Sequence, residues 1–248
     1  MRKKILILSN PGREGAENYC EGVKRDVDNY KQFFLSPVGG NWYESEIDCR
    51  QYATKSEVLK LLKDMRNLDF SIIIFVGHGY SQYNRSYVEL KPSIWQNDTT
   101  NDMDTEEFRE SACKRIVILD CCRKEWVPLF EHNAVVNRIE KSFSMYRNTR
   151  EIYESVIEEM PIMNLFLYGC DLGETSGDDS RRGGYYSSAL LDVCYQKAQE
   201  YRHKQERYYV SAVQAHELAI PLVKKKKYDQ NPQIEKPRSE PYLPLAIV

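Results

Sequence analysis

Residues 70–76 (FSIIIFV) and residues 115–119 (RIVIL) are almost wholly apolar and rich in β-branched side chains. Strands of that composition are typical of a parallel sheet that is covered on both faces. Each stretch ends abruptly in residues of another kind, GHG at residues 77–79 and DCCR at residues 120–123. The two stretches therefore predict central strands of a parallel sheet, with reactive side chains at the edge where ligands bind in α/β proteins.

Strand and helix patterns alternate on both sides of these two strands. Residues 4–9 (KILILS) form a third apolar run, which Asn10, Pro11 and Gly12 stop in the manner of a buried strand that reaches its loop. Further strands are expected at residues 44–51, 163–168 and 243–248. One helix is expected from about residue 17 to the break at Pro37, and a second after the capping box of Thr54 and Glu57. Two more helices are expected at residues 184–202 and 210–218. The pattern predicts a three-layer α/β/α sandwich with a six-stranded, mainly parallel sheet.

The chain shows no repeat, low-complexity segment or Pro/Gly-rich linker. Residues 1–248 are therefore expected to form a single domain. One charged, largely helical insertion is expected at residues 124–160, between the fourth and fifth strands. Long excursions from the end of a sheet often line a site.

The composition argues against several classes of function. A formal net charge of -2 gives no long-range attraction for nucleic acid or an anionic membrane. The apolar run near the start is far shorter than a signal-peptide core or a membrane span, so a cytoplasmic location is expected. The seven cysteines lack CxxC spacing, which favours reduced thiols over a disulfide framework or a metal site.

His78 and Cys122 follow the two central strands, so neighbouring parallel strands would bring an imidazole and a thiol to the same edge. The imidazole favours the thiolate and can later protonate a leaving amine. The backbone amides of Gly79 and Cys122 are candidates for an oxyanion hole. Cys121 competes with Cys122 as the nucleophile, because side-chain alternation does not discriminate in a strand buried on both faces.

FVGHGY at residues 75–80 and VILDCCR at residues 117–123 resemble the caspase and metacaspase family of cysteine peptidases, in which these strands end in the catalytic His-Gly and Cys. Residues 21–34, 167–176 and 183–191 are similar to its first helix, fifth strand and next helix, so the resemblance covers nearly the whole chain. It implies a caspase-like fold and a cysteine endopeptidase with a dyad of His78 and Cys122. The chemistry of such a dyad requires no metal or organic cofactor.

The resemblance also bears on substrate preference. In metacaspases, an Asp of the first helix and an Asp two positions before the nucleophile select Arg or Lys, and Asp26 and Asp120 match those positions. Two carboxylates in one desolvated pocket repel each other unless a cation joins them. Arg13 keeps Asp-specific cleavage of the caspase type open, because it follows the first strand, where caspases carry a pocket Arg.

The resemblance implies a protein substrate and leaves two hypotheses about partners. The first is a pseudo-enzyme scaffold that keeps the fold and acts by binding a partner. The second is regulation by a partner or by self-processing, for which Arg147, Arg150 and the pair Arg181-Arg182 are candidate cleavage sites in predicted polar segments. A binding role for nucleic acid or membrane is not expected.

Overall fold

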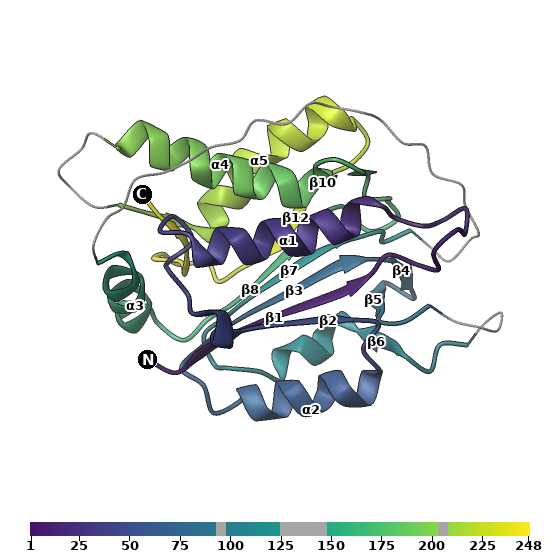
Figure 1. Ribbon diagram of the computed structural model, residues 1–248, viewed down its shortest axis with the longest axis horizontal. Helices are drawn as coiled ribbons and strands as arrows, with labels where there is room; N and C mark the ends of the chain where they lie inside the picture. Colours follow the sequence, from purple (N-terminus) through teal and green to yellow (C-terminus); the bar gives the residue numbers. More distant parts are fainter. Residues whose placement is uncertain (93–97, 125–147, 203–207) are drawn as a thin grey trace.

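The computed structural model describes residues 1–92, 98–124, 148–202 and 208–248 (Figure 1). Its central sheet has the strand order β12-β8-β7-β3-β1-β2. All pairs are parallel except β12 with β8, which is antiparallel. The strands are β1 (Lys3–Asn10), β2 (Ile47–Gln51), β3 (Phe70–Gly77), β7 (Arg115–Cys121), β8 (Asn164–Tyr168) and β12 (Gln233–Glu235). The predicted six-stranded, mainly parallel sheet is therefore confirmed.

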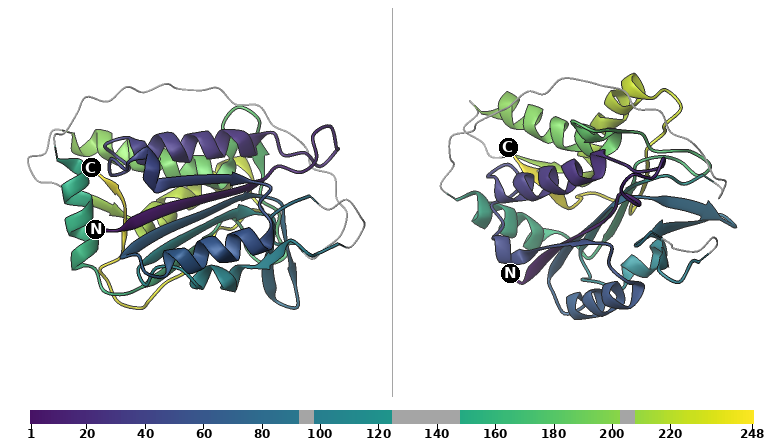
Figure 2. Two further views of the ribbon diagram at one scale, coloured as in Figure 1. Left: turned by 60° about the horizontal axis from the view of Figure 1, so that its bottom comes forward. Right: turned by 45° about the vertical axis from the view of Figure 1, so that its right-hand side comes forward.

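Helices cover both faces of the sheet and make three layers. The helices α1 (Gly22–Leu35), α4 (Tyr185–Tyr201) and α5 (Ala212–Lys226) lie on one face, and α2 (Lys55–Met65) lies on the other with the 3-10 turn η2 (Thr105–Arg109) (Figures 1 and 2). The sheet has one hydrophobic core on each face, and successive residues of a strand belong to opposite cores. Ile5 and Ile72 pack in the core on the α1 side, whereas Leu6 and Ile73 pack in the core on the α2 side. Burial of both strand faces explains the unbroken apolar runs in the sequence.

A small antiparallel sheet extends from the carboxyl end of β3. It consists of β4 (Gly79–Gln82), β5 (Arg85–Glu89) and β6 (Asp102–Asp104). Two short pairs complete the strands: β9 (Asp178–Asp179) with β10 (Gly183–Gly184), and β11 (Tyr209–Ser211) with β13 (Pro244–Ile247). The small sheet and the β9–β10 hairpin both lie near the carboxyl ends of the central strands (Figure 1).

Three sequence predictions need correction. The terminal strand exists as β13, but it pairs with β11, and β12 takes the sixth place in the central sheet. The expected strand at residues 44–51 begins with a 3-10 turn, η1 (Glu44–Glu46), so only β2 is extended. The first helix begins at Gly22, because residues 11–21 form the loop that leaves β1. The capping box of Thr54 and Glu57 is confirmed at the start of α2.

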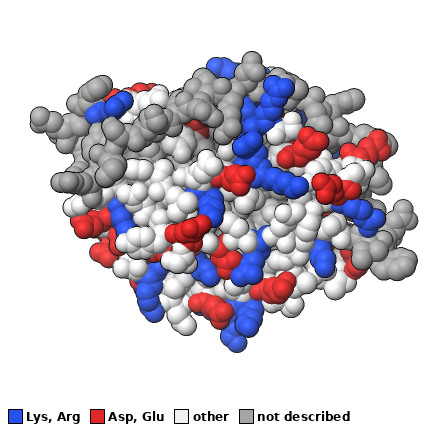
Figure 3. Space-filling view, in the orientation of Figure 1, with Lys and Arg blue, Asp and Glu red and all other residues white. Residues whose placement is uncertain are grey.

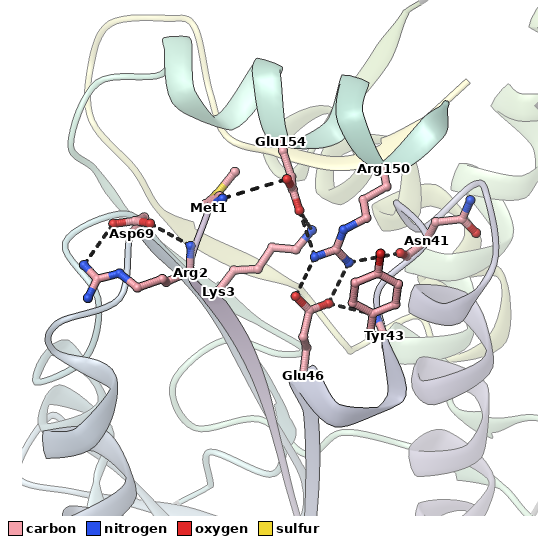
Figure 4. Close-up of polar contacts among 9 residues, drawn as sticks. All are labelled: Met1, Arg2, Lys3, Asn41, Tyr43, Glu46, Asp69, Arg150 and Glu154. Carbon is pink, nitrogen blue, oxygen red and sulfur yellow. Dashed lines mark hydrogen bonds and ion pairs between the residues drawn. The ribbon is translucent and has the colours of Figure 1, made fainter. Parts of the chain in front are cut away.

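Of the expected insertion, residues 125–147 lie outside the described residues, and α3 (Thr149–Glu159) follows them. An ion cluster fixes α3 to the amino end of the sheet (Figure 4). The Arg150 guanidinium contacts Glu46 of η1 at 2.6 Å and Glu154 at 3.0 Å, and Glu154 also contacts the Lys3 ammonium at 2.9 Å. Burial is the main reason why the pKa of Lys3 is lowered. Arg150 is therefore helical and ion-paired, whereas the sequence pattern predicted a polar segment there.

Candidate active site

His78 and Cys122 come to the same edge of the sheet. Strands β3 and β7 are parallel neighbours, and Gly77 pairs with Cys121, which places the following residue of each strand at the shared carboxyl end. Both side chains line one small hollow of about 30 Å³ that is partly open to solvent. The juxtaposition expected from the sequence is therefore present.

Asn10 fastens the segment that carries His78. This residue ends β1 and is fully buried. Its backbone carbonyl accepts a hydrogen bond from the His78 amide at 3.2 Å, and its side chain donates to the Glu89 carbonyl at 2.7 Å and accepts from the Gly12 amide at 3.0 Å. Gly77 has a φ of +135°, and a Cβ there would lie 2.1 Å from the Asn10 carbonyl oxygen. Only glycine fits this close approach.

The two neighbouring cysteines occupy different surroundings. Cys121 is 3% exposed, belongs to the core on the α2 side, and has a pKa raised well above its usual value by burial. Cys122 is partly exposed, and its Sγ lies 3.7 Å from the Ser176 carbonyl oxygen. A thiolate is the reactive form of cysteine, so the surroundings of Cys121 disfavour it as a nucleophile.

Gly79 packs against both cysteines. A Cβ on Gly79 would lie 2.8 Å from the Cys121 Sγ and 3.0 Å from the Cys122 carbonyl oxygen. The glycine therefore allows the chain after His78 to approach the chain around Cys122. The two segments that carry the candidate oxyanion donors lie against each other.

Cys20 is a site residue that sequence reasoning missed. The sequence pattern does not single it out, but its Sγ lies 3.7 Å from Nε2 of His78, and it lines the same hollow. It stands in the loop before α1, where no periodic pattern marks it as part of a site. The loop that leaves β1 folds back over the imidazole, since a Cβ on Gly12 would lie 2.7 Å from that Nε2.

Asp26 and Asp120 line the hollow together, as expected. Both are buried, with 2% and 6% of their surface exposed. Asp26 accepts hydrogen bonds from the Gly184 amide at 2.8 and 3.0 Å, and Asp120 accepts from the Ser187 amide at 2.8 Å and from the Ser176 hydroxyl. Gly184 and Ser187 belong to the start of α4, so both carboxylates also satisfy free amides of its first turn.

Burial raises the pKa of both carboxyl groups. For Asp26, burial is the largest cause and the charge of Asp120 is the second, and the pKa rises well above its usual value. For Asp120, burial prevails over its hydrogen bonds to Ser176 and Ser187. The Lys226 ammonium acts in the opposite direction on both. Asp178 adds a third carboxylate to the hollow and accepts from the Gly22 amide at 2.9 Å.

The chain is a mainly parallel α/β/α sandwich with His78 and Cys122 at the ends of adjacent strands. The family model of the caspase domain matches residues 2–242, and the chain therefore belongs to the caspase-domain family of cysteine-type peptidases. A search of curated proteins finds no match. The family assignment made from the sequence is confirmed.

Two further observations concern the described part of the chain. None of its helices combines the length and the apolar character needed to cross a membrane. It also contains no group of three or more His, Cys, Asp or Glu side chains placed to hold a metal ion.

Proposed function

We propose that the protein is a cysteine endopeptidase that cleaves protein substrates after Arg or Lys, with Cys122 as the nucleophile and His78 as the acid and base. One observation carries the proposal: His78, Cys122, Asp26 and Asp120 line a single hollow at the carboxyl ends of β3 and β7. The nucleophile and the acidic wall are thus within reach of one bound peptide.

The chemistry follows the general scheme for a thiol nucleophile. The Cys122 thiolate forms a bond to the carbonyl carbon, and the backbone amides of Gly79 and Cys122 bind the oxygen as it gains charge. The C–N bond then breaks, and the protonated His78 ring donates its proton to the leaving amine. Water then attacks the thioester while the neutral His78 ring takes a proton from it, and the C–S bond breaks. The acid product leaves and loses its proton to solvent, and the Cys122 thiolate beside protonated His78 is restored.

The acidic wall supports a basic substrate side chain. Asp26 and Asp120 are buried beside each other, and the charge of Asp120 opposes that of Asp26. A guanidinium or ammonium group between such carboxylates relieves the repulsion and gains charge-assisted hydrogen bonds. A substrate Asp side chain would add a further negative charge. Arg13 is exposed in the loop after β1 and is not among the described residues that line the hollow.

The test is hydrolysis of fluorogenic peptides that differ only in Arg, Lys or Asp before the scissile bond. We expect hydrolysis of the Arg and Lys peptides to exceed that of the Asp peptide by about two orders of magnitude, as a mismatched charge in a desolvated pocket requires. Preference for Asp would refute the acidic pocket. Absence of hydrolysis of all three, also after incubation with a cell lysate of the source, would favour the scaffold hypothesis.

The partners and the cellular location are part of the proposal. All seven cysteines are free thiols, which suits the reducing cytoplasm. In the view of Figure 3, Lys and Arg form one run from the upper edge to the middle of the face, and elsewhere they lie beside Asp and Glu. The formal net charge of -2 is the observation that argues against nucleic acid or an anionic membrane as a partner. Self-processing is best placed at Arg181, which is exposed between β9 and β10, whereas Arg182 is ion-paired with Asp192 at 2.6 Å. Arg147 lies outside the described residues.

A further inference from the structure

Gln230 is a fully buried glutamine in the segment that joins α5 to β12. Its side-chain nitrogen donates to the Gly169 carbonyl at 2.7 Å and to the Ser176 hydroxyl at 3.0 Å, and its side-chain oxygen accepts from the Gly177 amide at 3.0 Å. Because a carbonyl only accepts and a backbone amide only donates, these partners fix the orientation of the side-chain amide. One side chain therefore holds both ends of the loop 169–177, which joins β8 to β9.

The loop that Gln230 holds encloses the Asp120 carboxylate. The Ser176 hydroxyl donates to Oδ1 of Asp120, and a Cβ on Gly169 would lie 2.7 Å from the same oxygen. Asp120 and Ser176 line the hollow, and Gln230 is not among the described residues that do. Gln230 thus reaches the acidic wall of the hollow from behind, through hydrogen bonds to the residues that surround Asp120.

The contact of Gln230 with Ser176 sets the direction of the serine proton. A hydroxyl has one proton to donate and accepts through its oxygen. The Gln230 nitrogen donates to the Ser176 oxygen, and the Ser176 proton goes to the Asp120 carboxylate. Burial raises the pKa of Asp120, and the hydrogen bond from Ser176 acts against that rise. A donor held in place therefore favours the ionised carboxylate, which is the form that attracts a cation.

Other contacts join the same loop to the segment between α5 and β12. The Lys227 ammonium donates to the Thr175 carbonyl at 2.9 Å, and the Asn231 amide donates to the Glu174 carboxylate at 2.7 Å. Because these contacts remain when Gln230 is changed, the loop should keep its place in the fold. The particular contribution of Gln230 is then the orientation of one hydroxyl, rather than the attachment of the loop.

We propose that Gln230 is a positioning residue that directs the Ser176 hydroxyl to Asp120 and so prepares the Asp120 carboxylate to bind a basic substrate side chain. The inference rests on the proposed peptidase function and its acidic hollow. Gln230 does not touch the substrate in this role, since it acts through Ser176. Its substitution should weaken substrate binding and leave the chemical step nearly unchanged.

The experiment measures kcat and KM for a fluorogenic Arg peptide, and the affinity for the small cation benzamidine by calorimetry. Gln230→Met keeps the length of the side chain and removes its polar atoms. We expect it to raise KM and the dissociation constant of benzamidine roughly tenfold, with kcat within about threefold of the wild type, because a hydrogen bond that supports a charged group is weakened.

Gln233→Met is the matched control. Gln233 is an exposed glutamine three residues further along, and its amide contacts Asp171 of the same loop at 3.2 Å. It is not among the described residues that line the hollow. Its kcat, KM and benzamidine affinity should match those of the wild type.

Ser176→Ala tests the route from Gln230 to Asp120. It removes the hydroxyl that donates to Asp120, so we expect the same rise in KM as in Gln230→Met. In the double variant Ser176→Ala/Gln230→Met, KM should lie within about threefold of that of Ser176→Ala, because both changes remove one shared interaction. Additive effects, with KM raised about a hundredfold, would show that Gln230 does not act through Ser176.

A merely structural role of Gln230 would have another signature. Partial unfolding lowers the amount of active enzyme and hence the apparent kcat, without a change in KM. A loss of kcat alone in Gln230→Met, or constants equal to those of the wild type, would overturn the positioning role. If thermal unfolding shows that Gln230→Met does not fold, unaltered KM and benzamidine affinity in Ser176→Ala overturn it equally.

The outcomes also separate this role from the proposed function. A wild-type protein that cleaves no peptide but binds benzamidine, with weaker binding in Gln230→Met, would refute the peptidase and support the role of Gln230. A wild type that neither binds benzamidine nor cleaves the Arg peptide would overturn both.

Discussion

The amide of His78 donates to the carbonyl of Asn10, so the end of β1 sets the position of the imidazole that follows β3. The Asn10 side chain also satisfies the Gly12 amide and the Glu89 carbonyl, all within a buried site. We expect Asn10→Ala to lower the free energy of unfolding by about 2–4 kcal/mol, because it leaves two backbone groups without partners. Urea denaturation measures this loss. A loss below about 0.5 kcal/mol, the range of ordinary surface substitutions, would contradict the role given to Asn10.

Substitution of the two cysteines at the end of β7 should have different effects on catalysis and on stability. Cys122→Ala is expected to lower kcat/KM by at least about 10³-fold, since it removes the proposed nucleophile. Cys121→Ala removes a buried thiol and should chiefly reduce stability, by about 1–2 kcal/mol, with kcat/KM within about tenfold of the wild type. Peptide hydrolysis and thermal unfolding of both variants give the comparison. The reverse order of effects on kcat/KM would show that the nucleophile is Cys121.

Binding of a cation in the acidic hollow should strengthen as pH rises. Asp26 has a pKa raised well above its usual value, so its carboxyl group is neutral at pH values where an ordinary Asp is already charged. A neutral carboxyl attracts a cation weakly, and ionisation above the raised pKa adds the attraction. We therefore expect benzamidine, a small amidinium probe, to bind more tightly toward alkaline pH, as measured by calorimetry.

Asp26→Asn provides the matched variant for this pH dependence. It should bind benzamidine about tenfold more weakly at alkaline pH and show a flatter dependence, because one titrating carboxylate is gone. Asp192→Asn is the control, because Asp192 pairs with Arg182 and does not line the hollow. Its affinity for benzamidine should show the same pH dependence as that of the wild type. Equal pH dependence in Asp26→Asn and the wild type would exclude Asp26 from the cation site.

The ion cluster at the amino end of the sheet should affect stability and not catalysis. Arg150→Met leaves the carboxylates of Glu46 and Glu154 facing each other without their shared guanidinium (Figure 4). We expect a loss of about 1–3 kcal/mol, because the cluster is mostly buried, and an unchanged kcat/KM of the folded enzyme. The double variant Arg150→Met/Glu46→Gln should regain part of the loss. A drop in kcat/KM without a loss of stability would show coupling between the cluster and the site.

The central strands, and the positions of His78 and Cys122 after them, could be predicted from the sequence. The reason is that strands buried on both faces consist of unbroken apolar runs. The sixth strand could not. Residues 233–235 (QIE) are short and half polar, whereas the apolar terminal run looks like a core strand and in fact pairs with β11. Apolar composition reports burial, and it does not specify which strand is the partner.

The candidate active site could also be predicted only in part, because local sequence patterns do not specify contacts between distant segments. Asp26 and Asp120 were found through the resemblance to a family, but their bonds to the first turn of α4 depend on the packing of distant segments. Cys20 reaches His78 through the loop before α1, which has no periodic pattern. Contacts of this kind arise from tertiary structure and leave no local signal.

Covalent trapping tests the central claim most directly. A peptidyl chloromethyl ketone ending in Arg is incubated with the wild type and with His78→Ala, and the modified residue is located by mass spectrometry. We expect modification at Cys122 in the wild type, a rate lower by at least about 10²-fold in His78→Ala, and little reaction with the matching Asp reagent. Modification at Cys121 or Cys20, an unchanged rate in His78→Ala, or a faster reaction with the Asp reagent would contradict the account.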